Sequence, residues 1–340
     1  MRKVYFRADG DPNIGLGHVI RSCALAEMLK TTFECTFFIR TPSAYLLEEI
    51  QKSGCSVRSL EETDHYKEAI EWAKRLKGDE IIVLDGYAFD TNYQQILKKT
   101  GCPIVCIDDI HAYHFVADVI INHGTVNSRM YSAEPYSRIL AGPEYCLLRQ
   151  PFTAGRPIPA PANSTVFLNF GGADKYNLTT RYIKEILGDG RVKFIHVVLG
   201  NAFQYFDELK DAIIAGDEAK VELHNSLTAE GMVDIISQCE LAIVPGSTVA
   251  LECASLGIAM ISGYYVDNQI DINSMLTALG LSLTKGDFNT SPQEINELIG
   301  KALSPDVKNG LLKMQDTFFD GRSAERLLDL FISLSQKQPA

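Results

Sequence analysis

The sequence predicts an α/β protein made of two doubly wound domains, each built on a parallel sheet. Short apolar runs alternate with longer amphipathic segments along almost the whole chain, which is the pattern of strands and helices in such sheets. The chain has 340 residues, more than the roughly 150 typical of one domain. A proline-rich segment near the middle interrupts the alternation and predicts a domain boundary.

Residues 1–150 form the first predicted domain. Amphipathic segments separate its apolar runs; Val19–Lys30 shows helical spacing, and "LEEIQKSG" and "AIEWAKRLKG" each end in a glycine that suits a helix C-terminus. Five of the apolar runs are predicted to be buried parallel strands: Lys3–Arg7, Cys35–Ile39, Ile81–Leu84, Ile104–Ile107 and Val119–Ile121.

Residues 151–163 are predicted to be a linker, because four prolines fall between positions 151 and 161. A second domain is expected over 164–317, followed at 318–340 by a segment that ends in an amphipathic helix. The strands expected in the second domain are Thr165–Phe170, Phe194–Leu199, Val221–Leu223, Leu241–Val244 and Ala259–Gly263.

Composition excludes several classes of protein. The net charge is −11, whereas nucleic-acid binding requires a basic face. The eight cysteines contain no CxxC pair and are expected to be buried thiols in a reducing compartment. Arg7 and Asp9 interrupt the apolar start too early for a signal peptide, and no apolar run is long enough to cross a bilayer. A cytoplasmic protein without stable membrane insertion is expected.

The stretch "ADGDPNIGLGHVIRSC" places Gly15, Gly17 and His18 where the first strand becomes a helix. A dinucleotide fingerprint requires a third glycine, and Ile20 occupies that position. His18 is either a residue satisfied by a neighbouring backbone group or a general base at the sheet edge where ligands bind. The helix N-terminus disfavours the imidazolium, whereas a bound diphosphate would favour it. Arg21 is either a solvated helix residue, or a residue that orients the site or pairs with an acid such as Asp9.

Two glycine-containing turns mark the second domain. In "NFGGADKYN", Gly171 and Gly172 are expected to start a helix whose free backbone N–H groups bind an anion, although a plain tight connection has the same pattern. In "VPGSTVALE", a strand leads into Gly246, Ser247 and Thr248. Glu252 is expected on the first turns of the following helix, either to bind a ribose diol or as a partner of the helix dipole.

In combination these elements resemble the nucleotide-sugar-binding proteins of GT-B architecture, including the MurG-type glycosyltransferases. The opening R-x-D-x-x-x-x-I-G-x-G-H-x-x-R is more specifically similar to the UDP-2,4-diacetamido-2,4,6-trideoxy-β-L-altropyranose hydrolases of pseudaminic acid biosynthesis and their SpsG-like relatives. The residues on the family pattern are Arg7, Asp9, Ile14, Gly15, Gly17, His18, Arg21, Gly171, Gly172, Asp174, the turn 247–252, Asn268 and Gln269.

The resemblance implies two Rossmann-like domains that face an interdomain cleft, with the C-terminal helix crossing back to the first domain. It implies an inverting hydrolase that needs no cofactor and no metal, with a UDP-linked amino-deoxy sugar as substrate and UDP as product. The second domain would bind UDP, and His18 would activate water. Asn268 would hold the sugar or the water, and Tyr87 would lie near the sugar. Gly86 departs from the family pattern, which leaves the sugar specificity open.

Further acidic residues follow the third and fourth predicted strands. Asp85 belongs to the family's Asp-x-Tyr element, and Asp108 and Asp109 are either sugar contacts or turn-capping residues. The seven histidines are dispersed, so no metal site is expected, although His111 and His114 would share a face if they were helical. Two alternatives to the hydrolase remain: an inverting glycosyltransferase, and a non-catalytic nucleotide-sugar-binding protein.

Overall fold

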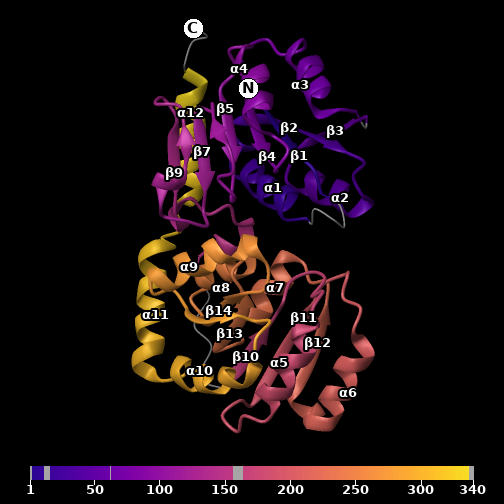
Figure 1. Cartoon of the computed structure of the whole chain (residues 1–340), viewed down its shortest axis with the longest axis vertical. Helices are drawn as coiled ribbons and strands as arrows, with labels where there is room; N and C mark the ends of the chain where they lie inside the picture. The colour runs from indigo at the N-terminus through magenta and orange to yellow at the C-terminus, as the bar shows by residue number, and fades with distance from the viewer. Residues whose placement is uncertain (1, 11–15, 62, 156–163, 337–340) are drawn as a thin grey trace. The chain divides into compact units, whose positions relative to one another are not determined.

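The computed structural model describes residues 2–10, 16–61, 63–155 and 164–336. These residues form two compact units, one comprising the described parts of Met1–Gln150 and Arg322–Ala340 and the other those of Pro151–Gly321. Each unit has its own parallel sheet with helices packed on it (Figure 1). The α/β class and the two parallel sheets predicted from the sequence are therefore confirmed.

The first unit is built on a seven-stranded sheet in which all neighbouring strands are parallel. Its central strands are buried on both faces, which is why they have near-continuous apolar sequences. The strands, in spatial order, are β3 (Ser56–Leu60), β2 (Phe33–Arg40), β1 (Arg2–Ala8), β4 (Ile81–Asp85), β5 (Ile104–Ile107), β7 (Val119–Asn122) and β9 (Arg138–Ala141).

Helices cover both faces of this sheet. Helices α1 (Gly17–Leu29) and α2 (Ala44–Lys52) pack on one face, and α3 (His65–Ala73) and α4 (Thr91–Lys98) pack on the other. Side chains of Ser43, Asp64 and Asp90 accept hydrogen bonds from the first N–H groups of α2, α3 and α4. The smaller elements are β6 (His114–Phe115), β8 (Ser132–Ala133) and 3-10 turns at Ser128–Met130 and Pro143–Tyr145.

The C-terminal helix α12 (Ser323–Gln336) belongs to the first unit, although it follows the second unit in sequence (Figure 1). Its apolar side joins the cluster formed by α1, α2 and the sheet through Leu327, Leu330, Phe331 and Leu334. The Phe331 ring meets the Phe33 ring edge-on at 6.2 Å. Burying this side is what makes an amphipathic helix of this length stable.

The second unit is built on a six-stranded parallel sheet. Its strands, in spatial order, are β12 (Val221–Asn225), β11 (Phe194–Leu199), β10 (Thr165–Leu168), β13 (Leu241–Pro245), β14 (Ala259–Tyr264) and β15 (Leu283–Asp287). Its helices are α5 (Leu178–Leu187), α6 (Phe206–Gly216), α7 (Ala229–Ile236), α8 (Thr248–Leu256), α9 (Ile270–Ala278), α10 (Ile295–Ala302) and α11 (Pro305–Phe318). Single 3-10 turns lie at Gln150–Phe152, Glu218–Lys220, Asp267–Gln269 and Pro292–Glu294.

The sequence correctly predicts the central strands and misses β3, β9 and β15. Each of these three strands lies at an edge of its sheet. Edge strands expose part of their surface, so their sequences "SVRSL", "RILA" and "LTKGD" contain charged residues and lack a continuous apolar run. Most of the expected linker, residues 156–163, lies outside the described residues.

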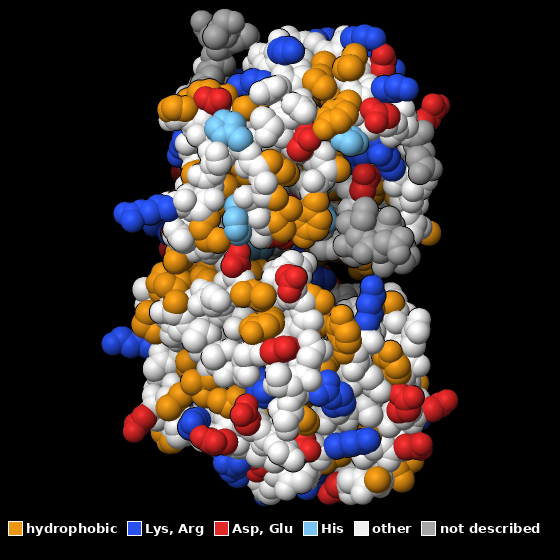
Figure 2. All heavy atoms as spheres, in the orientation of Figure 1, with side chains coloured by type: hydrophobic (Ala, Val, Ile, Leu, Met, Phe, Trp, Pro, Cys, Tyr) orange, Lys and Arg blue, Asp and Glu red, His pale blue; other side chains and the backbone are white. Residues whose placement is uncertain are grey.

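Two features bear on the excluded classes of protein. Among the described residues no helix combines the length and the apolar character needed to cross a membrane. On the face drawn in Figure 2, Lys and Arg side chains are interspersed with Asp and Glu and do not gather into one basic patch.

Substituting Phe331→Ala should destabilise the first unit by about 3–5 kcal/mol, because it removes a fully buried aromatic side chain from the contact of α12 with the core. Urea denaturation measures the change. Ile214→Ala is the control, because Ile214 is 66% exposed on α6 of the second unit. Equal stabilities for the two variants would contradict the docking of α12.

Candidate functional site

In both sheets the order of strands reverses beside the first strand of the unit. Strand β1 lies between β2 and β4, and β10 lies between β11 and β13. Ligands of open α/β sheets bind outside the carboxyl ends of the strands at such a reversal. The residues that follow β1, β4, β10 and β13 are therefore expected to form the ligand-binding edges of the two sheets.

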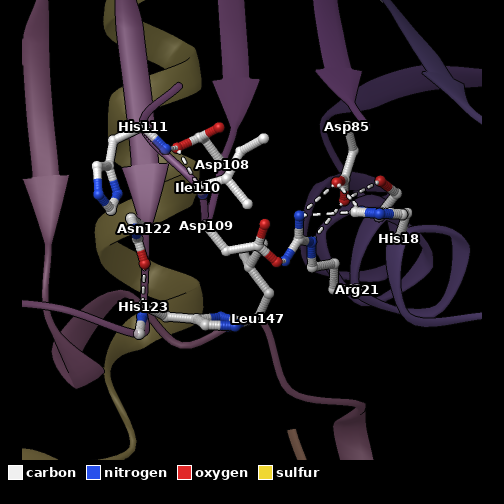
Figure 3. Close-up of polar contacts among 12 residues, drawn as sticks. His18, Arg21, Asp85, Asp108, Asp109, Ile110, His111, Asn122, His123 and Leu147 are labelled. Atoms are coloured by element: carbon white, nitrogen blue, oxygen red, sulfur yellow. Dashed lines mark hydrogen bonds and ion pairs between the residues drawn. The ribbon is translucent and has the colours of Figure 1, made fainter. Parts of the chain in front are cut away.

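His18 lies in the first turn of α1, the helix that follows β1, and is 5% exposed. Its Nδ1 lies 2.8 Å from Oδ1 of Asp85, the last residue of β4 (Figure 3). Nη2 of Arg21 also lies 3.1 Å from this Nδ1, but it donates to Asp85 Oδ1 at the shorter distance of 2.6 Å. An ionised carboxylate only accepts hydrogen bonds and is the closer partner of Nδ1, so we assign the ring hydrogen to Nδ1. In the neutral ring Nε2 then carries a lone pair, and it forms no hydrogen bond with another described residue.

Asp85 is fully buried and is held by the Arg21 guanidinium and the Ser22 hydroxyl as well as by His18. Arg21 donates to both carboxylate oxygens, through Nη2 at 2.6 Å and Nε at 2.8 Å, and Ser22 Oγ donates at 3.1 Å. Burial acts to raise the pKa of the Asp85 carboxyl, but the Arg21 charge and the hydrogen bonds from His18 and Arg21 hold it below its ordinary value. Asp85 is therefore an anion that orients His18.

Asp109 extends this cluster from the end of β5. Its Oδ2 accepts from Arg21 Nη1 at 2.7 Å, while its Oδ1 is buried and has no hydrogen-bond partner in the described chain. Arg21 is thus a buried bridge between two carboxylates. Arg21 does pair with acids, but these are Asp85 and Asp109 and not Asp9. The interpretation of Arg21 as a solvated arginine is wrong, because Arg21 is 7% exposed.

His123, which follows β7, belongs to the same region and was missed by sequence reasoning. Its Nδ1 accepts from the Leu147 backbone N–H at 3.2 Å, so a neutral ring carries its hydrogen on Nε2 (Figure 3). Burial and the nearby Arg21 charge lower its pKa to about 4. No local sequence signal marks His123, because its relation to Arg21 arises from the order of strands in the sheet.

Tyr87 and Asp108 have different surroundings. The Tyr87 ring contacts the His18 ring edge-on at 4.7 Å and is 43% exposed, so it lies at the surface beside the imidazole. Asp108 accepts hydrogen bonds from the backbone N–H groups of Ile110 and His111 and from the Tyr131 hydroxyl. This is the turn-capping role left open for Asp108 by the sequence.

Arg7 and Asp9 form a neighbouring network at the end of β1. Arg7 is 1% exposed and donates to both oxygens of Asp9, at 2.6 and 2.7 Å, and to Glu68. Arg40 pairs with the same Glu68, and its backbone N–H donates to Asp9. These ion pairs join the carboxyl ends of β1 and β2 to α3. Gly17 begins α1, and Gly15 lies outside the described residues.

The first glycine turn of the second unit differs from its prediction. Gly171 and Gly172 follow β10 but do not start a helix, because α5 begins at Leu178. The Asp174 carboxylate accepts from the N–H groups of Leu178 and Thr179, both at 2.8 Å. Asp174 therefore caps α5, and those N–H groups are not available to an anion. Gly171 has a φ of +82°, which favours glycine.

The second turn of this unit, between β13 and α8, leaves its helix N-terminus open. Ser247 is the N-cap of α8 but makes no side-chain capping bond, and the first turn contains no acidic residue. The N–H groups of Thr248 and Val249 have no acceptor within the described chain. Gly246 lets the backbone at Gln269 pack closely against this turn, because a Cβ at position 246 would lie 2.7 Å from the Gln269 carbonyl oxygen. This turn, unlike that of α5, has no carboxylate on the first N–H groups of its helix.

The remaining predicted residues lie near this second turn. Glu252 is 4% exposed in the second turn of α8, one turn later than a helix-start position. Gln269 accepts from the Tyr265 N–H through Oε1, which stabilises the 3-10 turn at 267–269, and Asn268 is exposed on that turn.

In the first unit, His111 and His114 are not helical: His111 has a φ of +40°, and His114 lies in β6 beside Ser132 and Glu134.

The chain is similar in sequence to several known proteins. No protein-family model matches the chain. It is 24% identical to the spore coat polysaccharide biosynthesis protein SpsG of Bacillus subtilis over 84% of each chain. It is 23% identical to the UDP-2,4-diacetamido-2,4,6-trideoxy-beta-L-altropyranose hydrolase of Campylobacter jejuni, over 82% of this chain and 97% of that one. An uncharacterised protein of Methanocaldococcus jannaschii is 23% identical over 77% of this chain, which spans about half of that protein, 55%.

Solved structures show the fold over the whole chain. MurG of Acinetobacter baumannii matches with a TM-score of 0.66 and 15% identity, covering 98% of this chain and all of that one. The chain adopts the GT-B fold. A UDP-glucosyltransferase of Polygonum tinctorium matches with a TM-score of 0.69 and 12% identity over 99% of this chain and 100% of that chain. At these identities the likeness extends to the GT-B fold alone.

The lowered pKa of His123 makes the free energy of unfolding depend on pH. The unfolded ring binds a proton below about 6.5, whereas the folded ring does so below about 4. Stability is therefore lost as the pH falls from about 6.5 to 4, by about 2–3 kcal/mol at pH 4.5. His123→Asn keeps an acceptor for the Leu147 N–H but cannot titrate. Between pH 7 and 4.5 its free energy of unfolding, measured by urea denaturation, should therefore fall by about 2–3 kcal/mol less than that of the parent chain. Identical losses would contradict the buried neutral ring.

Proposed function

We propose that the chain is an inverting nucleotide-sugar hydrolase that releases UDP from a UDP-linked diacetamido-trideoxy sugar by attack of water. The observation that carries this proposal is the pair formed by His18 and Asp85. The imidazole Nδ1–H is held by a buried anion, so the Nε2 lone pair is oriented for proton abstraction at the carboxyl edge of the sheet.

The proposed reaction is a single displacement at the anomeric carbon. His18 Nε2 removes a proton from water while the water oxygen bonds to the anomeric carbon. The bond from that carbon to the diphosphate oxygen breaks, and UDP departs with the electron pair. Attack from the face opposite the departing UDP inverts the anomeric centre. Asp85 stabilises the imidazolium that forms, because its negative charge lies 2.8 Å from Nδ1.

In this proposal the second unit binds the nucleotide. The uncapped N-terminus of α8, with Gly246, Ser247 and Thr248, would receive the diphosphate. Backbone N–H groups and the helix dipole stabilise the charge that develops as UDP leaves, so the step itself needs neither a metal nor a strong general acid. Gly171, Gly172 and Gln269 would shape the same nucleotide site, and buried Glu252 would bind the ribose.

The sugar is proposed to lie at the first unit's carboxyl edge. Tyr87 offers an aromatic ring beside His18. Asp109 Oδ1 and the Nε2–H of His123, which lie on the Arg21 side of the cluster, would supply an acceptor and a donor, a set that suits a sugar bearing amide groups. Asn268 would hold the sugar or the attacking water. The Campylobacter hydrolase acts, by its name, on such a diacetamido sugar, and this supports the choice of substrate class.

An inverting glycosyltransferase is the second candidate, and the GT-B neighbours favour it. The same His18–Asp85 pair would then deprotonate an acceptor hydroxyl in place of water. UDP release from the nucleotide sugar in buffer without any acceptor supports the hydrolase. Turnover that begins only when an acceptor is added supports the transferase and contradicts the proposal.

His18→Asn should lower kcat for UDP release by at least about 100-fold, because the proton acceptor is lost. The asparagine amide occupies the position of Nδ1 and keeps the hydrogen bond to Asp85, so calorimetric affinity for UDP should stay within about twofold. His114→Asn, on β6 of the same unit, is the matched control and should keep parental kcat. A loss below tenfold in His18→Asn would remove His18 from the role of base.

Gly200→Ala should weaken UDP binding by at least about fivefold. A Cβ at position 200 would lie 2.3 Å from the Gly172 Cα, so the glycine turn after β10 must shift. Gly190→Ala is the control, because nothing lies within 4 Å of a Cβ there. Calorimetry with UDP gives both the affinity and the binding-competent fraction, which separates a displaced turn from a misfolded unit. Equal affinities in folded Gly200→Ala and the parent chain would contradict the part proposed for Gly171 and Gly172 in the nucleotide site.

A further inference from the structure

A cluster of two histidines and one glutamate lies in the second unit, outside the turns assigned to the nucleotide. His196 is on β11, and Glu222 and His224 are on the neighbouring strand β12. The parallel register pairs His196 with Glu222 and Val198 with His224. Because side chains alternate between the two faces of a sheet, all three side chains lie on the same face.

The potential ligand atoms converge on one point. His196 Nδ1 lies 3.0 Å from His224 Nε2 and 3.5 Å from Glu222 Oε2, and His224 Nε2 lies 3.9 Å from the same oxygen. From these three separations, a point about 0.7 Å above the plane of the atoms lies about 2.2 Å from each of them, close to the bond lengths of tetrahedral Zn²⁺ to imidazole nitrogen and carboxylate oxygen.

A hydrogen bond between the two rings explains only part of this arrangement. One N–H between His196 and His224 accounts for their 3.0 Å separation. It does not account for the glutamate oxygen, which faces both nitrogens at 3.5 and 3.9 Å. A shared cation satisfies all three atoms, since each then offers a lone pair to the same centre.

We propose that His196, Glu222 and His224 bind a divalent transition-metal ion of the Zn²⁺ type. Two imidazoles and one carboxylate suit Zn²⁺ far better than Mg²⁺ or Ca²⁺, which prefer sets of oxygen ligands. Three protein ligands leave the fourth tetrahedral position to water. Among the described residues this is the one group of three or more His, Cys, Asp or Glu side chains whose ligand atoms are this close together.

The proposed ion would join the edge strand β12 to β11. β12 has a paired neighbour on one side only, and its residues are half-buried or exposed. A metal bond from His196, which is 6% exposed on the buried strand, to two side chains of β12 adds a link that backbone hydrogen bonds do not supply. Because the ion binds the folded pair of strands, its binding stabilises the second unit.

The site is tested on the full chain after treatment with a chelator and desalting. Titration with Zn²⁺ should show one equivalent bound and a higher melting temperature, and Mg²⁺ should show neither. Co²⁺ should give visible absorption bands typical of a tetrahedral site. It should give no near-ultraviolet charge-transfer band, because the cysteines are buried and are not ligands.

Two conservative variants assign the ligands. Glu222→Gln, at a side chain 55% exposed, and His224→Asn should each weaken Zn²⁺ binding at least tenfold without loss of fold. His114→Asn is the matched control, because His114 faces Glu134 at 3.3 Å without a third ligand. The proposal is overturned if the parent chain shows no saturable Zn²⁺ binding, if both variants bind as the parent does, or if Co²⁺ gives the thiolate band.

Discussion

The buried carboxylate of Asp85 is the charge around which the first unit is organised at its carboxyl edge. It ends β4, is fully inaccessible to solvent, and accepts hydrogen bonds from His18, from two nitrogens of Arg21 and from Ser22. A buried anion is stable only while it is paired, and removing one partner of such a pair costs about 3–5 kcal/mol. The same interactions that make the anion tolerable also determine which nitrogen of His18 carries its hydrogen.

The N-termini of two helices in the second unit differ in whether a side chain caps them. The Asp174 carboxylate accepts hydrogen bonds from the first two N–H groups of α5, so these groups need no ligand as an acceptor. Ser247 makes no such bond to α8, and no acidic residue lies in its first turn. An open helix N-terminus beside the reversal of strand order attracts an anion through its dipole and its free N–H groups. This contrast is the physical basis for placing the diphosphate at α8.

Much of the fold follows from local patterns in the chain. Strands buried on both faces carry continuous apolar sequences, so the central strands of both sheets were predicted nearly to their ends. The edge strands β3, β9 and β15 were not, because one side of each lacks a neighbour and their sequences are polar. Glycine turns were found as motifs, yet Gly171 and Gly172 do not start a helix, since Asp174 caps α5 only at Leu178 and Thr179.

His18 itself is visible in the sequence, because a histidine between glycines and a helix after a buried strand is a local pattern. Its partners are not. Asp85 lies 67 positions from His18, and Asp109 lies 88 positions from Arg21. These four residues meet because β1, β4 and β5 are neighbours in the sheet. The same holds for His123 and for His196 with Glu222 and His224, which only the register of parallel strands brings together. Local sequence determines which segments become strands and turns. The order of strands in the sheet determines which of their side chains lie close enough to form ion pairs and hydrogen bonds or to bind one metal ion.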